Sequence, residues 1–200
     1  MVVFDATLLM YLFRPEIDPP TDVSTGLIID RWRDRLNLLV ATLEKERTKV
    51  IVPSPALAEL LVRAGAEKAQ RIVEEINKSS VLKIESFDAL AAIEVATMTR
   101  AAIANGSKSD GLSATWAKIK YDRQIVAIGK VHQATVIYSD DADIKSHAEK
   151  VGIKVLGVVD LPAPPEKAQF EMFKEATPDE AEIAEAEIAA QNAGESPPGL

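Results

Sequence analysis

Short apolar runs alternate with longer segments of helical spacing over most of the chain. Runs rich in valine, isoleucine and leucine predict buried strands over residues 1–5, 49–53, 81–84, 135–138 and 153–159. Between them, apolar residues recur at intervals of three and four, which predicts helices over residues 6–13, 24–47, 55–64, 66–77, 88–104, 112–132 and 143–150. Strands that alternate with helices predict an α/β fold, a three-layer α/β/α sandwich around a mostly parallel central sheet.

The C-terminal part of the chain differs in composition from the rest. Prolines in the segment LPAPPEK mark a linker, and the run rich in proline, alanine and glutamate that follows has little apolar surface to bury. Within it, residues 177–180 fit a helix start with proline at the first helical position. We therefore expect one domain over residues 1–161 and an acidic tail over residues 162–200 that is partly helical or disordered.

The acidic tail also accounts for the net charge of the chain, which is −8. Residues 160–200 contain ten acidic and two basic side chains, so the remaining chain holds 21 of each sign. The domain itself is therefore neutral, and the acidity of the whole chain does not exclude a nucleic-acid partner.

Cysteine is absent, and His132 and His147 are the two histidines. This composition excludes disulfides, thiolate zinc sites and cysteine nucleophiles, and it disfavours a site built from several histidines. A metal would be held mainly by oxygen atoms, which favours Mg²⁺ or Mn²⁺. The apolar N-terminus lacks a basic region, and no segment approaches the roughly 18 apolar residues of a membrane helix, so we expect a cytoplasmic protein with no membrane partner.

Four acids stand where they would frame the carboxyl ends of the strands, the edge at which a parallel α/β sheet binds ligands. Asp5 ends the first predicted strand and Asp141 follows the fourth, while Glu59 and Asp122 lie on predicted helices. Simpler explanations exist for single members of this set. Asp5 is a favourable helix N-cap, and Asp122 lies four residues from Lys118, a spacing that suits a helix-surface ion pair.

The order of these acids resembles that of the PIN-domain nucleases, and especially of the VapC-type toxins of toxin–antitoxin pairs. The matching segments are VVFDATLLMYLF, VPSPALAELL, KYDRQIVAIGKVH and VIYSDDADI, which together span residues 1 to about 159. The resemblance implies a PIN-like fold and places the catalytic, metal-binding positions at Asp5, Glu59, Asp122 and Asp141. Compared with compact members of the family, residues 14–48 form an insertion that contains a helix.

The same resemblance suggests further residues of the site. Asp143 matches an additional acid of the family, and Asp140 leaves the register of the last acid open by one residue, so both are candidate ligands. Ser139 and Thr7 fall on small polar positions that would support the ligands from behind. Lys118, Lys120 and Arg123 surround Asp122 and are candidates for contacts with RNA phosphates, although an ordinary solvated helix face has the same composition.

The resemblance implies a metal-dependent endoribonuclease, plausible as the toxin of a toxin–antitoxin pair. Converging carboxylates repel one another unless a cation joins them, and Mg²⁺ or Mn²⁺ would also activate water against an RNA phosphodiester. The implied partners are an RNA substrate, an inhibitory antitoxin-like protein and a second copy of the chain.

Two other classes of function compete with this one. A PIN-like module that has lost catalysis would serve as a protein-interaction module, although no acidic position is missing from the chain. A phosphatase with an aspartyl nucleophile would want a second aspartate two residues after Asp5, where Thr7 stands. A receiver-like domain would want a second acid near Asp5 and a lysine after the fourth strand, and neither is evident.

Overall fold

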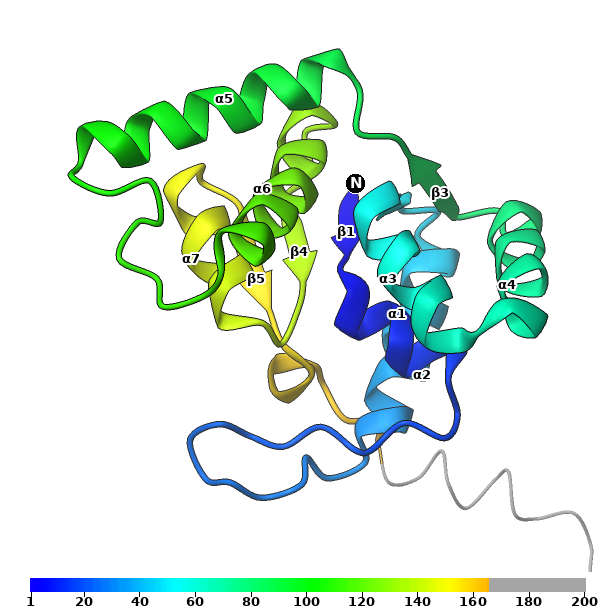
Figure 1. Cartoon of the computed structure of the whole chain (residues 1–200). Coiled ribbons are helices and arrows are strands. Elements are labelled where there is room, and N and C mark those ends of the chain that lie inside the picture. The colour runs from blue at the N-terminus through cyan, green and yellow to red at the C-terminus, as the bar shows by residue number, and fades with distance from the viewer. Residues whose placement is uncertain (166–200) are drawn as a thin grey trace, which may run out of the picture. The chain divides into compact units, whose positions relative to one another are not determined.

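The predicted strands form one sheet in the computed structural model, which describes residues 1–165 (Figure 1). The strands are β1 (Val2–Phe4), β2 (Val50–Pro53), β3 (Leu82–Glu85), β4 (Val136–Tyr138) and β5 (Lys154–Leu156). They lie in the order β3-β2-β1-β4-β5, and every neighbouring pair is parallel. The expected parallel sheet is confirmed.

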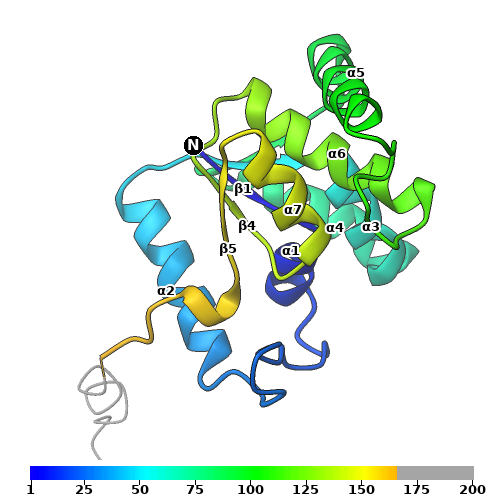
Figure 2. The same cartoon turned by 90° about the vertical axis from the view of Figure 1, so that its left-hand side faces the viewer.

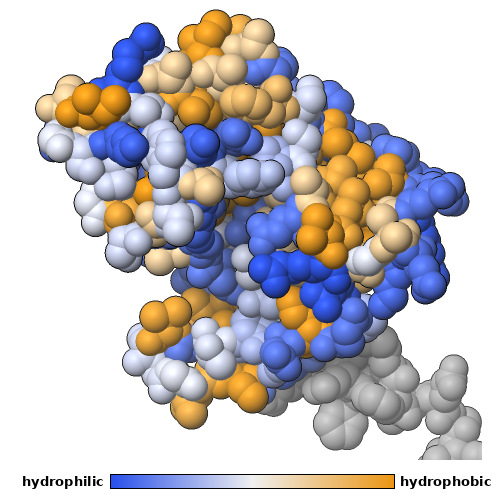
Figure 3. Space-filling view, viewed as in Figure 1, coloured by the Kyte–Doolittle hydropathy of each residue, from blue (hydrophilic) through white to orange (hydrophobic). Residues whose placement is uncertain are grey.

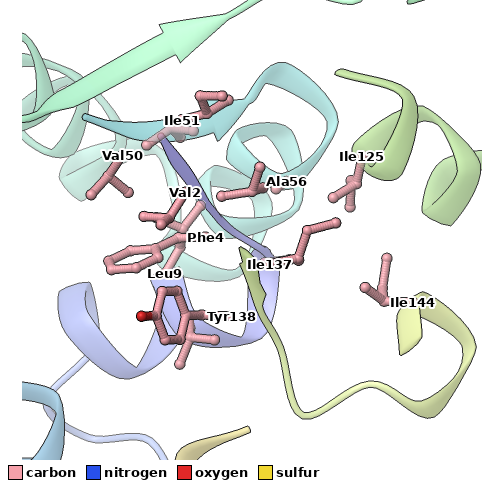
Figure 4. Packing of buried hydrophobic residues seen from close by; sticks show 14 of the residues in the cluster. Val2, Phe4, Leu9, Val50, Ile51, Ala56, Ile125, Ile137, Tyr138 and Ile144 are labelled. Carbon is pink, nitrogen blue, oxygen red and sulfur yellow. The ribbon is translucent and has the colours of Figure 1, made fainter. Parts of the chain in front are cut away.

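β1 is the central strand of the sheet. Its Val3 pairs with Ile51 of β2 on one side and with Ile137 of β4 on the other, and all three side chains are buried. Figure 4 shows these strands packed among apolar side chains from the surrounding helices, including Leu9 and Ile125. Strands covered on both faces need apolar residues at successive positions, which explains why they appear in the sequence as continuous apolar runs.

Helices cover both faces of this sheet. They are α1 (Ala6–Phe13), α2 (Trp32–Lys45), α3 (Ser54–Ala64), α4 (Ala66–Lys78), α5 (Ala89–Ala104), α6 (Trp116–Val131) and α7 (Ala142–Lys150), followed by a 3₁₀ turn, η1 (Val158–Asp160). Figure 2 shows α2 on one side of the strands and α3 and α6 on the other. The three-layer α/β/α arrangement is therefore confirmed.

Two helices begin later than the sequence pattern predicts. The helix expected from residue 24 starts at Trp32, because Gly26 and Arg31 have φ values of 70° and 53°, which an α-helix excludes. The helix expected from residue 112 starts at Trp116, where the Thr115 side chain accepts a hydrogen bond from the backbone N–H of Lys118. Apolar spacing alone did not reveal these turns.

The residues before α2 form an ordered loop over part of the predicted insertion. Thr21 and Ile28 form an antiparallel bridge, and the backbone N–H of Ile29 donates to the carbonyl of Pro20. Leu27 and Ile28, which are among the apolar residues of the helix predicted over residues 24–47, are exposed. Leu27 and Ile28 therefore lie on the outer side of this loop, whereas Ile29 is buried in the hydrophobic core.

Helix α6 approaches the centre of the sheet closely at Gly129. A Cβ atom at this position would lie 2.9 Å from Cγ2 of Val3, closer than carbon atoms pack. The glycine therefore fixes how closely α6, which carries Asp122, lies against β1.

None of the helices in residues 1–165 is long and apolar enough to cross a membrane. One compact unit spans Met1–Ala163. The helix expected after residue 177, and most of the acidic tail, lie outside the described residues.

Candidate metal centre

The sheet reverses its direction of growth between β1 and β4. From β1 the chain adds β2 and β3 on one side, and it then crosses to add β4 and β5 on the other. Such a switch point leaves a crevice at the carboxyl ends of the two strands, where open α/β sheets bind ligands. Figure 1 shows α1 and α7 leaving this end of β1 and β4, so Asp5 and residues 139–141 meet there.

Asp5 is buried at the end of β1. One of its carboxylate oxygens accepts the backbone N–H of Leu8 and thereby caps α1, and the other accepts the hydroxyl of Ser139. Burial raises the pKa of the Asp5 carboxyl to about 7, the hydrogen bonds from Ser139 and Leu8 oppose this, and the charge of Asp141 adds to it. Asp5 is thus the N-cap of α1, as the simple explanation has it. Its negative charge is nevertheless unfavourable at the switch point, because the carboxylate is buried there.

Asp122, Asp141 and Asp143 form the densest group of acids in the described residues. One carboxylate oxygen from each lies within 4.8 Å of one from each of the others. Asp122 comes from the middle of α6, while Asp141 and Asp143 come from the start of α7. Asp141 is fixed because its carboxylate accepts the backbone N–H groups of Asp143 and Ile144. The register of α7 therefore aims two carboxylates at α6.

Lys118 lies among these three carboxylates. Its Nζ atom is 2.8 Å from Asp122, 3.0 Å from Asp141 and 2.7 Å from Asp143. Burial alone would lower the pKa of Lys118, but the three carboxylates outweigh it and hold the pKa above its ordinary value. The expected ion pair with Asp122 is therefore present, as one third of a larger cluster.

The ionised form of Asp122 is disfavoured by burial and by the neighbouring carboxylates of this cluster. Its burial raises the pKa of the carboxyl to about 6, Lys118 opposes the rise, and the charges of Asp141 and Asp143 add to it. Carboxylates whose pKa is raised by burial and by one another gain from a bound cation, because the cation removes both penalties. All of the donor atoms are oxygens, so the residues present fit Mg²⁺ or Mn²⁺.

The structure distinguishes Asp140 from Asp141. Asp140 accepts the backbone N–H of Val158 and lies 2.6 Å from the position that a Cβ on Gly157 would take. Burial raises the pKa of the Asp140 carboxyl, and the hydrogen bond from Val158 opposes the rise. Asp140 thus holds the segment after β5, and Asp141 is the member of the pair that faces Asp122 and Asp143.

Glu59 lies outside the contacts that join the aspartates. Its carboxylate pairs with Arg63 one turn further along α3, at 3.3 Å, and 43% of its side chain is exposed. Among the described residues, the structure brings Glu59 into hydrogen-bond or ion-pair contact with none of the other three acids of the predicted quartet. Its place among the ligands stays a prediction.

An open cleft lies beside Asp141. It has a volume of about 780 Å³ and runs between the loop before α2 and the end of β4, and its lining includes Thr7, Tyr11, Ser139, Asp141 and Lys145. Figure 3 shows the hollow between this loop and the body of the domain. Thr7 therefore faces the cleft, whereas Ser139 contacts Asp5 directly.

The three basic residues near Asp122 have different surroundings. Lys120 is exposed on α6, and Lys118 is bound to the acids. Arg123 is fully buried, where it donates to Thr99 and pairs with Asp110 at 3.2 Å, so its side chain is not at a surface that RNA could reach. Sequence reasoning missed this pairing, because Asp110 lies in a loop with no periodic signal.

Sequence reasoning also missed the contact between Lys118 and Asp143. The spacing of four residues signals a pair between Lys118 and Asp122, but nothing in the sequence indicates that α7 approaches the same ammonium group.

Comparisons with known proteins agree with the fold. No protein-family model matches the chain, and no curated protein matches it by sequence. Among solved structures, one chain of FitAB bound to an IR36 DNA fragment is similar, with a TM-score of 0.51 and 17% identity over 81% of this chain and 98% of that one. One chain of VapBC2 from Rickettsia felis, bound to a DNA fragment from its promoter, gives a TM-score of 0.52 and 15% identity over 78% and 98%. At this level of sequence identity the likeness concerns the fold alone, and the chain has the PIN-like fold that its acidic motifs predict.

Proposed function

We propose that this protein is a metal-dependent endoribonuclease whose centre is formed by Asp5, Asp122 and Asp141, with Asp143 as a further ligand. The observation that carries the proposal is the convergence of three carboxylates within 4.8 Å at the switch point of a PIN-like sheet. Asp5 lies close enough for the charge of Asp141 to raise its pKa. This set of oxygen donors suits Mg²⁺ or Mn²⁺.

The residues of the chain would divide the work of hydrolysis. Bound Mg²⁺ or Mn²⁺ would neutralise the scissile phosphate and activate a water molecule. Ser139 holds the orientation of Asp5, and the N-terminal N–H groups of α7 hold that of Asp141. Lys120, exposed on α6, would contact a neighbouring phosphate of the RNA. Glu59 would join the ligands only if its pairing with Arg63 were released.

We propose further that the protein is the toxin of a toxin–antitoxin pair. The VapC-type toxins that its acidic motifs resemble belong to toxin–antitoxin pairs, and two solved structures to which it is similar are FitAB and VapBC2, each bound to DNA. An inhibitory partner would cover the cleft beside Asp141, whose rim includes the exposed side chain of Val23. Co-purification of the untagged chain with the product of an adjacent small gene, and loss of RNA cleavage in that complex, would support this role.

A homodimer is the second assembly that we propose. Helix α5 is apolar and yet exposes Leu90, Ile93 and Ile103. Figure 3 shows orange patches at the top of the molecule, where α5 lies in the same view in Figure 1. Exposed apolar patches of this kind are typical of subunit interfaces. Light scattering on the wild type and on Ile93→Asp tests the assembly, and a monomer in both cases would contradict it.

RNA cleavage tests the proposed activity. Purified protein is incubated with single-stranded and structured RNA, and separately with DNA, in Mn²⁺, in Mg²⁺ and in chelator. Cleavage of RNA that requires the metal and is lost in Asp122→Asn and Asp141→Asn supports the nuclease, with Glu67→Gln on the exposed face of α4 as a matched control. Cleavage that persists in both aspartate variants would identify a contaminating enzyme. Folded protein that cleaves neither nucleic acid would favour the interaction module.

A further inference from the structure

The ammonium group of Lys118 and a divalent cation need the same oxygen atoms. Nζ lies 2.7–3.0 Å from one oxygen each of Asp122, Asp141 and Asp143, and these are the carboxylates that lie within 4.8 Å of one another. Mg²⁺ holds carboxylate oxygens at about 2.0–2.1 Å. Two cations cannot both sit at such distances from the same three groups, because they would repel each other at contact range.

The side chain of Lys118 is more exposed to solvent than the side chains of its three partners. Its side chain is 40% exposed, while that of Asp122 is 9% exposed. Asp141 is additionally held by two backbone N–H groups of α7. Lysine carries its charge on a flexible four-carbon stem, so the ammonium can move into solvent while the carboxylates stay in place.

The charges favour such an exchange. Three carboxylates face the single positive charge of Lys118, so the cluster keeps an excess of negative charge around a buried Asp122. A divalent cation compensates more of that charge than an ammonium group does. The ammonium group of Lys118 therefore offsets only part of the repulsion among the carboxylates, and its replacement by a divalent cation is favourable.

We propose that Lys118 is a tethered competitor of the divalent cation, which holds the three carboxylates together and leaves them when the metal binds. The proposal rests on the proposed function, because it concerns the same centre. Displaced by the metal, Lys118 lies one helical turn from Asp122, on the rim where an RNA phosphate would approach. The residue thus sets how much metal the enzyme needs before it becomes competent.

Direct titration with Mn²⁺, followed by the paramagnetic resonance signal of the free ion, tests the proposal without RNA. Lys118→Met should bind Mn²⁺ about tenfold more tightly than the wild type, because a competing charge at contact distance is gone. Lys120→Met, which removes an exposed lysine two residues away on the same helix, should bind Mn²⁺ as the wild type does. Equal or weaker Mn²⁺ binding by Lys118→Met overturns the proposal, as does an equal gain in Lys120→Met.

Thermal unfolding in chelator and in Mn²⁺ guards against a folding defect. Without its ammonium group the cluster is repulsive, so Lys118→Met should melt at a lower temperature than the wild type in chelator and recover with Mn²⁺. A variant that folds only with Mn²⁺ supports the proposal. Lys118→Gln, which keeps a polar end on the stem, serves as a second variant, and it should also bind Mn²⁺ more tightly than the wild type.

The two proposals fail in different ways. Tighter Mn²⁺ binding by Lys118→Met in a protein that cleaves no RNA leaves the competitor in place and overturns the nuclease. RNA cleavage by the wild type, together with an unchanged Mn²⁺ affinity in Lys118→Met, supports the nuclease and overturns the competitor. Absence of Mn²⁺ binding in the wild type and in every variant overturns both.

Discussion

Ser139 donates its hydroxyl hydrogen to a carboxylate oxygen of Asp5 and so joins the residues that directly follow β4 and β1. The same hydroxyl oxygen accepts the backbone N–H of Asp141 at 3.0 Å. One side chain therefore orients the buried acid of the first strand and the start of α7 together.

Removal of this hydroxyl should weaken the metal site. Ser139→Ala leaves Asp5 and the N–H of Asp141 without a shared partner, and loss of such a supporting group typically costs about 10–100-fold in metal affinity. Ser139→Thr keeps the hydroxyl and should bind Mn²⁺ within a few-fold of the wild type. Mn²⁺ titration compares the three proteins, and wild-type affinity in Ser139→Ala would show that Asp5 is positioned by its cap on α1 alone.

Asp5→Asn should stabilise the fold at high pH while abolishing RNA cleavage. Because the pKa of Asp5 is raised from 3.8 to about 7, its contribution to stability is complete below pH 3.8 and is lost as the pH rises through 7. Asparagine avoids this loss and still caps α1, so the free energy of unfolding at pH 8 should rise by roughly 2 kcal/mol or more. Urea unfolding in chelator at pH 4 and pH 8 measures the difference, which should vanish at pH 4.

His147 should make the fold sensitive to acid. Burial, together with the charges of Arg123 and Lys150, lowers the pKa of its imidazole from 6.5 to about 4. The unfolded chain therefore binds a proton that the folded one does not, and stability present above pH 6.5 is lost as the pH falls toward 4. About 2 kcal/mol should be lost by pH 5.

The difference between the wild type and His147→Gln isolates this titration from that of the aspartates. Urea unfolding at pH 7 and pH 5 should show a smaller loss of stability in the variant. Equal losses in both proteins would mean that protonation of His147 does not destabilise the folded domain.

Gly129→Ala should destabilise the domain even though alanine favours helices. The added methyl group would lie 2.9 Å from Val3 Cγ2, and overpacking of this kind costs about 1–3 kcal/mol. The gain in helix propensity is about 1 kcal/mol, so a net loss of up to about 2 kcal/mol is expected. The double variant with Val3→Ala should recover part of that loss, and additive losses would argue against a direct clash.

The sequence was sufficient for the sheet because its strands are buried on both faces. A run such as residues 50–53 must be apolar at every position to lie between β1 and β3, and its short length and β-branched residues favour a strand over a helix. Asp5 and Asp141 were predictable for a related reason, since the carboxyl ends of parallel strands meet at one edge.

The details that the sequence could not supply depend on distant partners. Asp140 and Asp141 are identical in type, and the backbone N–H of Val158 decides which of them turns away from the centre. Arg123 belongs to a basic stretch of α6, yet Asp110 draws it inside. The left-handed residues Gly26 and Arg31 end a helical pattern that apolar spacing would otherwise continue.

The pairing of β1 with β4 also determines when the centre can exist during synthesis. Val2 and Val136 are neighbours in the sheet, although most of the domain lies between them in the chain. A ribosome that has made only residues 1–135 has produced Asp5 and Asp122 but neither Asp141 nor Asp143, which lie at the start of α7. The acids therefore assemble only when the last helix has left the ribosome, and a nascent or truncated chain carries an incomplete set of ligands.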